Sequence, residues 1–363
     1  MNRKQFLFLL ALAVLIGASG LMVYQRNHGA WERADTTIGG KLLPGLSVND
    51  VAQLDIQSGT NILQLTRRDN LWCVPARGNY PANFSQISDL LLKVADLKIV
   101  QTETVGSSQL GRFDLLPPAA PTNAGALVEF QDQSGKILAS LLLGKKHLHQ
   151  AAAGAGPDGM DGGWPDGRYV MSGTGGNQVA VISDPLDSLQ TQPESWLNKD
   201  FLSIEKPSAI TVQFPASTNN WQLTRTAETN DWQLADARPE EKLDTAKISN
   251  VTTPFSSASF NDVAPLTPDN TLTASNAVLT VNTFDGLSYT AHIGVAKDDN
   301  YPVSFAISAL SSAPATAADK VAKAAQYAHW VYYFPSYSID EILKPRGQLL
   351  IAATNAAPAV SGK

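Results

Sequence analysis

The sequence predicts an α+β protein: an N-terminal transmembrane helix followed by two tandem, internally duplicated domains, each an antiparallel sheet with a helix packed on it. Three observations predict this class. Residues 6–24 form an uncharged apolar run, apolar and polar residues alternate in many short segments downstream, and one order of such segments occurs twice. Alternation with a period of two is typical of strands that bury one face. The expected domains are residues 41–200 and 201–350.

The apolar run comes directly after Arg3 and Lys4. Its length is close to the roughly 20 residues that cross a bilayer as a helix. We therefore expect residues 1–4 to be a cytoplasmic stub, residues 5–24 an uncleaved single-pass anchor and residues 25–40 a linker. The small residues 17–20 leave a cleaved signal peptide open as the alternative. The basic end predicts a bacterial inner-membrane protein with most of the chain on the periplasmic side.

Composition narrows the possible partners. The formal net charge is -6, which argues against nucleic acid as a partner because nucleic acid requires a basic face. Cys73 is the single cysteine, so the chain forms no internal disulfide, and it lies in an expected strand beside Trp72, which favours a role in the core. The length that remains after the anchor is sufficient for two ordinary domains.

The duplication is clearest in two matching segments, residues 62–67 (ILQLTR) and 220–225 (NWQLTR). A polar turn and a tryptophan, Trp72 or Trp232, follow each of them. The unit is approximately βββ-α-ββββ-α, used twice. Its first strands are expected at residues 51–56 and 209–214, and its first helices from residue 81 or 83 to 97 and from residue 243 to about 251, where Pro254 ends the second one.

The later strands and helices complete each copy. The turn Gln133-Ser134-Gly135 in the first copy and Phe284-Asp285-Gly286 in the second join two strands as a hairpin. The strands are expected at 126–132, 136–143, 168–171 and 178–182, then at 277–283, 287–295, 303–307 and 329–334, with closing helices at 184–197 and 339–343.

Three segments lack strand periodicity. Residues 151–167 are rich in Gly, Asp and Pro and are expected to form an exposed, mobile insertion. Residues 309–326 are rich in Ala and Ser, which allows either a short helix or a loop. Residues 351–363 are small and polar, which predicts a disordered tail.

Several short motifs, in this order, carry a resemblance to a known family: Leu43–Leu46, the strand pair Leu65 to Trp72, Leu110–Leu115, Leu141–Gly144, Arg168–Val170, Ser195–Leu197 and Asp200–Leu202. From the anchor to about residue 350 the chain resembles the bacterial membrane-anchored domain-of-unknown-function family 4340, found beside ABC transporters of the gliding-motility type. The resemblance implies an envelope-facing accessory whose partners are permease or auxiliary subunits of an ABC transporter. It supplies no catalytic residues, and the insertion at 151–167 departs from it.

The sequence contains only weak signals for a catalytic or metal site. His147 and His149 at a strand end, with Asp161 and Asp166 after them, could together hold zinc or iron. An exposed strand end that runs into a loop is the preferred interpretation. No catalytic residue, cofactor-binding residue or cofactor is expected.

Aromatic residues are the remaining signal. Trp330, Tyr332 and Phe334 lie in one expected strand, and Trp221 lies in another. These four are candidates for an interaction surface. The preferred interpretation of the aromatic strand is that the two domains cover it on both sides.

Three functions therefore stay open. The preferred one is a membrane-anchored, periplasm-facing accessory or scaffold, not an enzyme, that acts by protein–protein interaction within an ABC-type transport or gliding-motility-like system. The second is a periplasmic module that binds a small molecule or glycan. The third is a metal-assisted hydrolase that uses His147 and His149.

Overall fold

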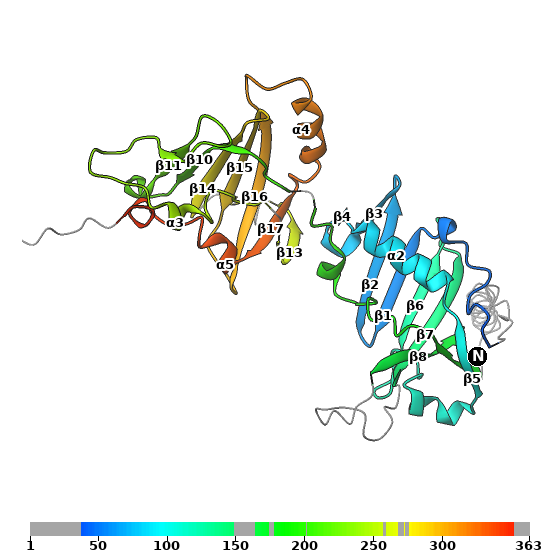
Figure 1. Ribbon diagram of the computed structural model, residues 1–363. Coiled ribbons are helices and arrows are strands. Elements are labelled where there is room, and N and C mark those ends of the chain that lie inside the picture. The colour runs from blue at the N-terminus through cyan, green and yellow to red at the C-terminus, as the bar shows by residue number, and fades with distance from the viewer. Residues whose placement is uncertain are drawn as a thin grey trace, which may run out of the picture. The chain divides into compact units, whose positions relative to one another are not determined.

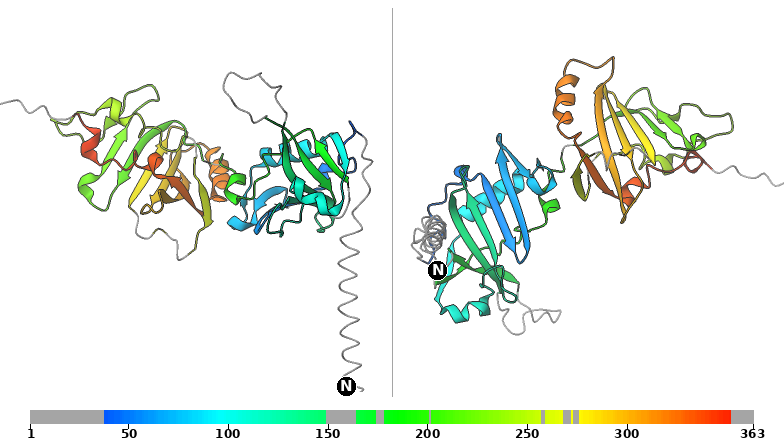
Figure 2. Two further views of the ribbon diagram at one scale, coloured as in Figure 1. Left: turned by 90° about the horizontal axis from the view of Figure 1, so that it is seen from below. Right: turned by 180° about the vertical axis from the view of Figure 1, so that it is seen from behind.

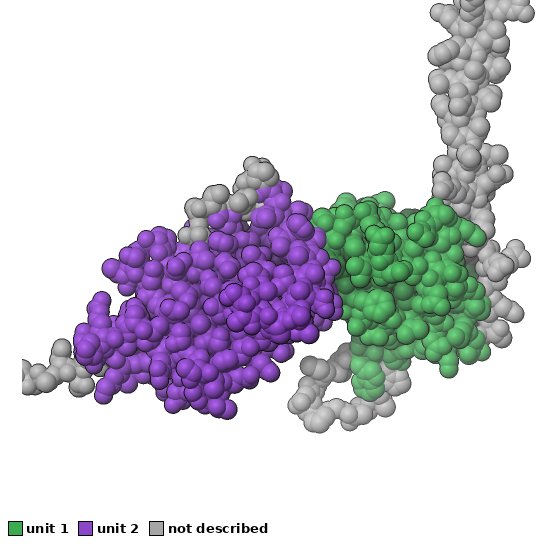
Figure 3. All heavy atoms as spheres, turned by 90° about the horizontal axis from the view of Figure 1, so that it is seen from above, with its two compact units in different colours: residues 1–196 green, residues 197–363 purple. Residues whose placement is uncertain are grey.

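The computed structural model describes residues 38–148, 164–173, 178–200, 202–256, 259–267, 272 and 276–351. The chain divides into two compact units, residues 1–196 and 197–363 (Figure 3). Each unit contains one sheet in which all neighbouring strands are antiparallel.

Unit 1 (residues 1–196) is built on a nine-stranded sheet in the order β4-β3-β2-β1-β6-β7-β8-β9-β5 (Figure 1). Its strands are β1 (Gln53–Ser58), β2 (Asn61–Arg68), β3 (Leu71–Val74), β4 (Tyr80–Pro81), β5 (Ile99–Thr104), β6 (Ala126–Gln131), β7 (Ile137–Leu148), β8 (Pro165–Ser172) and β9 (Gln178–Ile182). Its helical elements are α2 (Phe84–Ala95) and the 3-10 turns η1 (Val48–Asp50), η2 (Pro75–Arg77), η3 (Ser107–Phe113) and η4 (Pro193–Trp196).

The helix α2 lies across one face of this sheet (Figures 1 and 2). It begins where the side chain of Asn83 accepts a hydrogen bond from the backbone N–H of Gln86 at 3.1 Å, a typical N-cap. One stripe of the helix is apolar and packs on the sheet, because those side chains recur at helical spacing. The buried residues of the stripe are Ile87, Leu90, Leu91 and Val94.

The other face of the same sheet has a smaller apolar cluster at one end. It comprises Val105, Leu115, Leu142, Met171 and Val179, with η3 residues packed against it. Gly144 on β7 makes this close approach possible, since a Cβ there would overlap the backbone oxygen of Phe113 and come within 2.9 Å of the Leu115 side chain.

Unit 2 (residues 197–363) contains an eight-stranded sheet in the order β12-β11-β10-β14-β15-β16-β17-β13. Its strands are β10 (Pro207–Gln213), β11 (Trp221–Thr224), β12 (Gln233–Leu234), β13 (Asp262–Pro265), β14 (Ala277–Thr283), β15 (Leu287–Ile293), β16 (Asn300–Ala309) and β17 (Trp330–Pro335). The helical elements are α3 (Thr245–Ile248), α4 (Ala317–Ala325), α5 (Ser336–Ile339), η5 (Ser217–Asn219) and η7 (Arg346–Leu349).

The two sheets share one strand order. If β4 is left aside, each strand of unit 1 has a counterpart at the same place in the sheet of unit 2, from β3 and β12 at one edge to β5 and β13 at the other. In both units a helical segment (α2 or α3) carries the chain to the far edge, and a four-stranded meander then fills the space between.

The predicted α+β class with a transmembrane helix is wrong: the described structure consists mostly of two antiparallel sheets with few helices. The helix expected at 184–197 is only the 3-10 turn η4, because Pro185 and Pro193 interrupt the segment. In the second copy the helix expected at 243–251 is the four-residue α3, which is too short to form without the surrounding packing, and the helix expected at 339–343 is a turn that follows α5.

No helix within the described ranges is long and apolar enough to cross a membrane. The prediction of a single-pass transmembrane protein is therefore also wrong. The expected stub, the helix at residues 5–24, most of the linker and the tail after residue 351 lie outside the residues that the structure describes.

Arg346 on η7 fastens the end of unit 2 to the loop after β12. Its Nε and Nη2 donate to the two carboxylate oxygens of Glu241 at 3.1 and 2.7 Å, and its Nη1 donates to Asp236 at 2.7 Å. The two bonds from Arg346 to Glu241, together with the bond from the backbone N–H of Arg238, lower the pKa of Glu241 to about 2. A fork of this kind needs a guanidinium, because an ammonium cannot make two parallel bonds.

Substitution of Gly144 by Ala is expected to lower the free energy of unfolding by about 1–3 kcal/mol, because the clash is with backbone that must shift. Urea unfolding of the full chain measures this change in the free energy of unfolding. Gly106→Ala is the matched control: the nearest atom to its Cβ would be Ser108 Oγ at 3.9 Å, so stability should be almost unchanged. Equal stability of the two variants would show that η3 does not depend on Gly144.

Acid should remove the contribution of the Arg346–Glu241 pair to folding stability within a defined pH range. The folded pKa of Glu241 is depressed from 4.5 to about 2, so its contribution is complete above pH 4.5 and is lost as the pH falls towards 2. The melting temperature of the wild type should therefore fall more steeply across this range than that of Arg346→Gln. Glu240→Gln, which changes the neighbouring carboxylate, should keep the wild-type slope.

Candidate functional site

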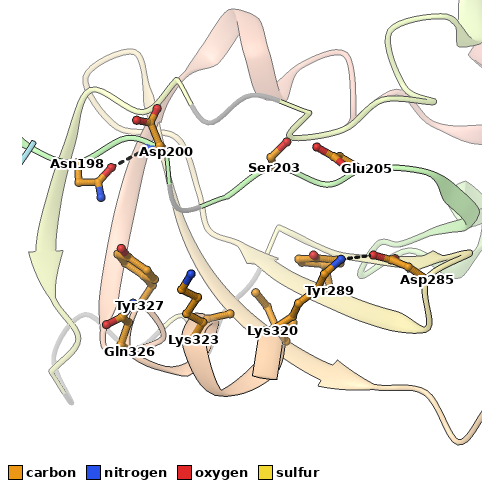
Figure 4. Close-up of a pocket in the computed structure, with 12 residues that line it drawn as sticks. Asn198, Asp200, Ser203, Glu205, Asp285, Tyr289, Lys320, Lys323, Gln326 and Tyr327 are labelled. Atoms are coloured by element: carbon orange, nitrogen blue, oxygen red, sulfur yellow. Dashed lines mark hydrogen bonds and ion pairs between the residues drawn. The ribbon is translucent and has the colours of Figure 1, made fainter. Parts of the chain in front are cut away.

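Unit 2 contains an open cleft with a volume of about 380 Å³ (Figure 4). The helix α4 and the residues that follow it form one wall, and residues 198–200 and 202–205 form the opposite wall. The β14–β15 turn and the strands β15 and β16 complete the lining. The residues are Asn198, Asp200, Ser203, Glu205, Asp285, Tyr289, Ile307, Lys320, Lys323, Ala324, Gln326 and Tyr327.

The turn Phe284-Asp285-Gly286 is where α4 is fastened. Lys320 on α4 donates to Asp285 at 2.6 Å, and the hydroxyl of the buried Thr283 donates to the same carboxylate. Gly286 has φ +82° and lies against the backbone of Ala313, a conformation and a proximity that only glycine accommodates well. The local sequence thus positions the charged pair.

Electrostatics keep that pair ionised. Burial raises the pKa of Asp285, but the hydrogen bonds from Lys320 and Thr283 outweigh it and hold the pKa below its usual value. The same bond raises the pKa of Lys320. At neutral pH the cleft therefore contains a carboxylate–ammonium pair on one side.

Two tyrosines supply neutral hydroxyls. Burial raises the pKa of Tyr289 and of Tyr327, and the nearby carboxylates Asp285 and Asp200 act in the same direction. Both phenols therefore stay protonated at neutral pH. Ser203 donates its hydroxyl to the carbonyl of Ser256 at 2.9 Å. The arrangement can bind a polar group through hydrogen bonds and charge.

The structure describes two of the four metal candidates. His147 on β7 and Asp166 on β8 are joined at 2.6 Å between Nδ1 and Oδ1, and the ring of Tyr169 lies edge-on to His147 with centroids 5.6 Å apart. His149 and Asp161 lie outside the described residues. The described parts of the chain contain no group of three or more His, Cys, Asp or Glu side chains arranged to hold a metal.

The aromatic candidates are placed in the interior of unit 2. Tyr332 and Phe334 are buried against Phe260 and Phe305 in edge-on contacts. Trp221 is also buried, and its Nε1 donates to the carbonyl of Lys344 at 2.8 Å. Trp330 is half-buried on β17. None of the four lines the cleft. Cys73 is buried too, which raises the pKa of its thiol.

Sequence reasoning missed the cleft. Lys320 and Tyr327 lie in or beside the Ala/Ser-rich segment whose helix or loop state was left open, and the segment 198–205 comes from the start of the unit. The one available signal was the Asp-Gly turn at 285–286, which marks a tight connection.

Comparison with known proteins finds one family model that matches part of the chain. Residues 159–277 match the model described as "Domain of unknown function (DUF4340)", so a DUF4340 domain is present in this part of the chain. The match begins before β8 of unit 1 and ends at the first residue of β14 in unit 2. No match was found among the curated proteins or among the solved structures.

Removal of the Lys320 charge should loosen α4. Since the Lys320–Asp285 bond fastens the helix to the β14–β15 turn, Lys320→Met is expected to speed hydrogen exchange of the α4 amides by a few-fold. Global stability should change little, because the Lys320 side chain is exposed and Asp285 is only half-buried. Lys323→Met, one turn further along the same helix, is the control. Unchanged exchange in Lys320→Met would mean that packing alone holds α4.

Proposed function

We propose that this protein is a non-catalytic accessory that binds a protein partner through the polar faces of its two sheets. The proposed location is the extracytoplasmic side of the bacterial inner membrane. The proposed partners are permease or auxiliary subunits of an ABC-type transport or gliding-motility-like system.

The observation that carries the proposal is the polar face of each sheet. In each unit the strands bury one set of alternate side chains beneath helices and turn the other set to the opposite face. That set is largely polar, except at the end of the unit 1 sheet that η3 covers. On that face a row of side chains crosses four neighbouring strands. In unit 1 the row is Gln64, Asp55, Glu129 and Ser140, and in unit 2 it is Gln222, Thr211, Thr280 and Thr290.

A surface of this shape favours a macromolecule. Four strands at the usual spacing extend over roughly 14 Å, and the side chains of a sheet face form a broad surface instead of an enclosed cavity. Sites for small molecules are normally concave and mostly apolar. Protein interfaces are wide, with polar side chains around a smaller core.

The location and the partner class rest on sequence. The DUF4340 domain at 159–277 agrees with the resemblance on which the transporter association depends. The proposed extracytoplasmic location depends on the same resemblance.

A small-molecule or glycan-binding module is the second candidate, and the cleft of unit 2 favours it. Its volume of about 380 Å³ is within the range of ligand sites, and Tyr289, Tyr327 and Lys323 offer aromatic and hydrogen-bonding groups.

Site-specific photo-crosslinking of the tagged full-length protein in membranes tests the proposal. A photoreactive residue at Gln64 or Gln222, both exposed on the polar faces, should capture transporter subunits identified by mass spectrometry. The same residue at Asp89, on the solvent side of α2, is the control and should capture them at least severalfold less. Capture of no protein from either face would contradict the proposal and favour the ligand-binding alternative.

A further inference from the structure

The row on the polar face of unit 1 contains two carboxylates directly opposite each other. Asp55 on β1 pairs with Gln64 on β2 and with Glu129 on β6, and Glu129 pairs with Ser140 on β7. Residues that pair across antiparallel strands project from the same face with Cβ atoms about 5 Å apart. Gln64 is exposed, Asp55 and Glu129 are half-buried, and Ser140 is buried.

Unit 2 has an equivalent row without charge. Thr211 on β10 pairs with Gln222 on β11 and with Thr280 on β14, and Thr280 pairs with Thr290 on β15. The four strands occupy the same places in the sheet order as β1, β2, β6 and β7. The fold therefore forms with hydroxyls at the positions of the two acids, so the acidic pair is not a requirement of the sheet.

The acidic pair is unfavourable in the unbound protein. Like charges directly opposite on neighbouring strands repel each other, and burial together with Asp55 raises the pKa of Glu129. Asp55 Oδ2 accepts bonds from Gln53 and Gln131 at 2.8 and 3.0 Å, and a hydrogen bond from Gln131 also lowers the pKa of Glu129, but burial and Asp55 outweigh it.

Two acceptor atoms of the row are buried without a hydrogen-bond partner. They are Asp55 Oδ1 and the hydroxyl of Ser140, whose residue is only 6% exposed. Buried acceptors of this kind are normally satisfied, so an unsatisfied pair beside a second carboxylate indicates a donor that the unbound protein does not supply.

We propose that the Asp55–Glu129 pair, with Ser140 and Gln64 beside it, binds a basic side chain, an arginine or lysine, of a protein partner. The inference rests on the proposed function, that the polar faces bind a protein, and it adds the chemistry that unit 1 recognises. A guanidinium matches the site well, because its several N–H donors lie in one plane and pair with carboxylates.

A metal ion fits this site less well. Calcium takes six to eight oxygen ligands, whereas this row has two carboxylates and one oxygen of Asp55 is already occupied by two amide donors. A single organic cation needs only two or three acceptors, which the row provides.

To test the inference, Asp55 and Glu129 are replaced by threonine, the residue found at the equivalent positions of unit 2. A labelled hexa-arginine peptide is titrated into the full-length protein and followed by fluorescence anisotropy. We expect Asp55→Thr/Glu129→Thr to weaken binding at least tenfold, since a hydrogen bond to a charged group is worth about one such factor or more. Asp69→Asn/Asp89→Asn removes the same charge from other exposed positions and should retain nearly wild-type binding.

Two further measurements keep the outcomes distinct. The melting temperature of Asp55→Thr/Glu129→Thr should equal or exceed that of the wild type, because repulsion is removed, and this result excludes misfolding as the cause of lost binding. If Asp55→Thr/Glu129→Thr binds the hexa-arginine peptide as tightly as the wild type does, the inference is overturned. It is also overturned if the wild type binds calcium ions, added as calcium chloride, but does not bind the peptide.

The proposed function can survive the failure of this inference. If photo-crosslinking through Gln64 still captures a partner from Asp55→Thr/Glu129→Thr at the wild-type level, the face binds protein but the acidic pair does not select a basic side chain. If crosslinking and peptide binding both fail in the wild type, the proposed function fails with it.

Discussion

The register between neighbouring strands is the constraint on which the structure depends. Because side chains alternate between the two faces, a slip of one residue would exchange the entire core with the entire polar face. The pairing of Leu54 with Leu65 and with Phe130 places three buried side chains side by side, and the same register places Asp55 beside Glu129. The core and the candidate interaction surface are thus fixed together, and neither can change register without the other.

The sequence contained the strands of the meander but not β5 and β13, which form one edge of each sheet. The structure has β9 at Gln178–Ile182 and β14 at Ala277–Thr283, the bounds expected from alternation. The edge strands β5 and β13 were missed, because β5 buries only Ile99 and β13 buries only Val263. Such strands form through their pairing with β9 and β17, distant segments of the chain, so their own residues have no strong local pattern.

The candidate sites were harder to predict than the strands. Alternation alone places Asp55 and Glu129 on outward positions, but their adjacency follows from the pairing of β1 with β6, about 70 residues later in the chain. The cleft likewise joins the segment 198–205 to α4. The aromatic strand was conspicuous in the sequence for a different reason: Tyr332 and Phe334 fill the interior beside β16. In this fold the most conspicuous hydrophobic segments of the sequence form the core. The polar rows join residues from separate strands, so they cannot be recognised until the strand pairing is known.

The limits of the family match have a practical meaning for fragments of this protein. Residues 159–277 contain β8 and β9 but not their neighbours β7 and β5, and they contain β10 but almost none of its neighbour β14. A fragment cut at these limits would consist of two incomplete sheets with unpaired edges, the kind of surface on which chains aggregate. The matched region therefore does not contain a complete sheet. A fragment intended to be soluble has to follow the sheets instead, ending near residue 196 or beginning near residue 197.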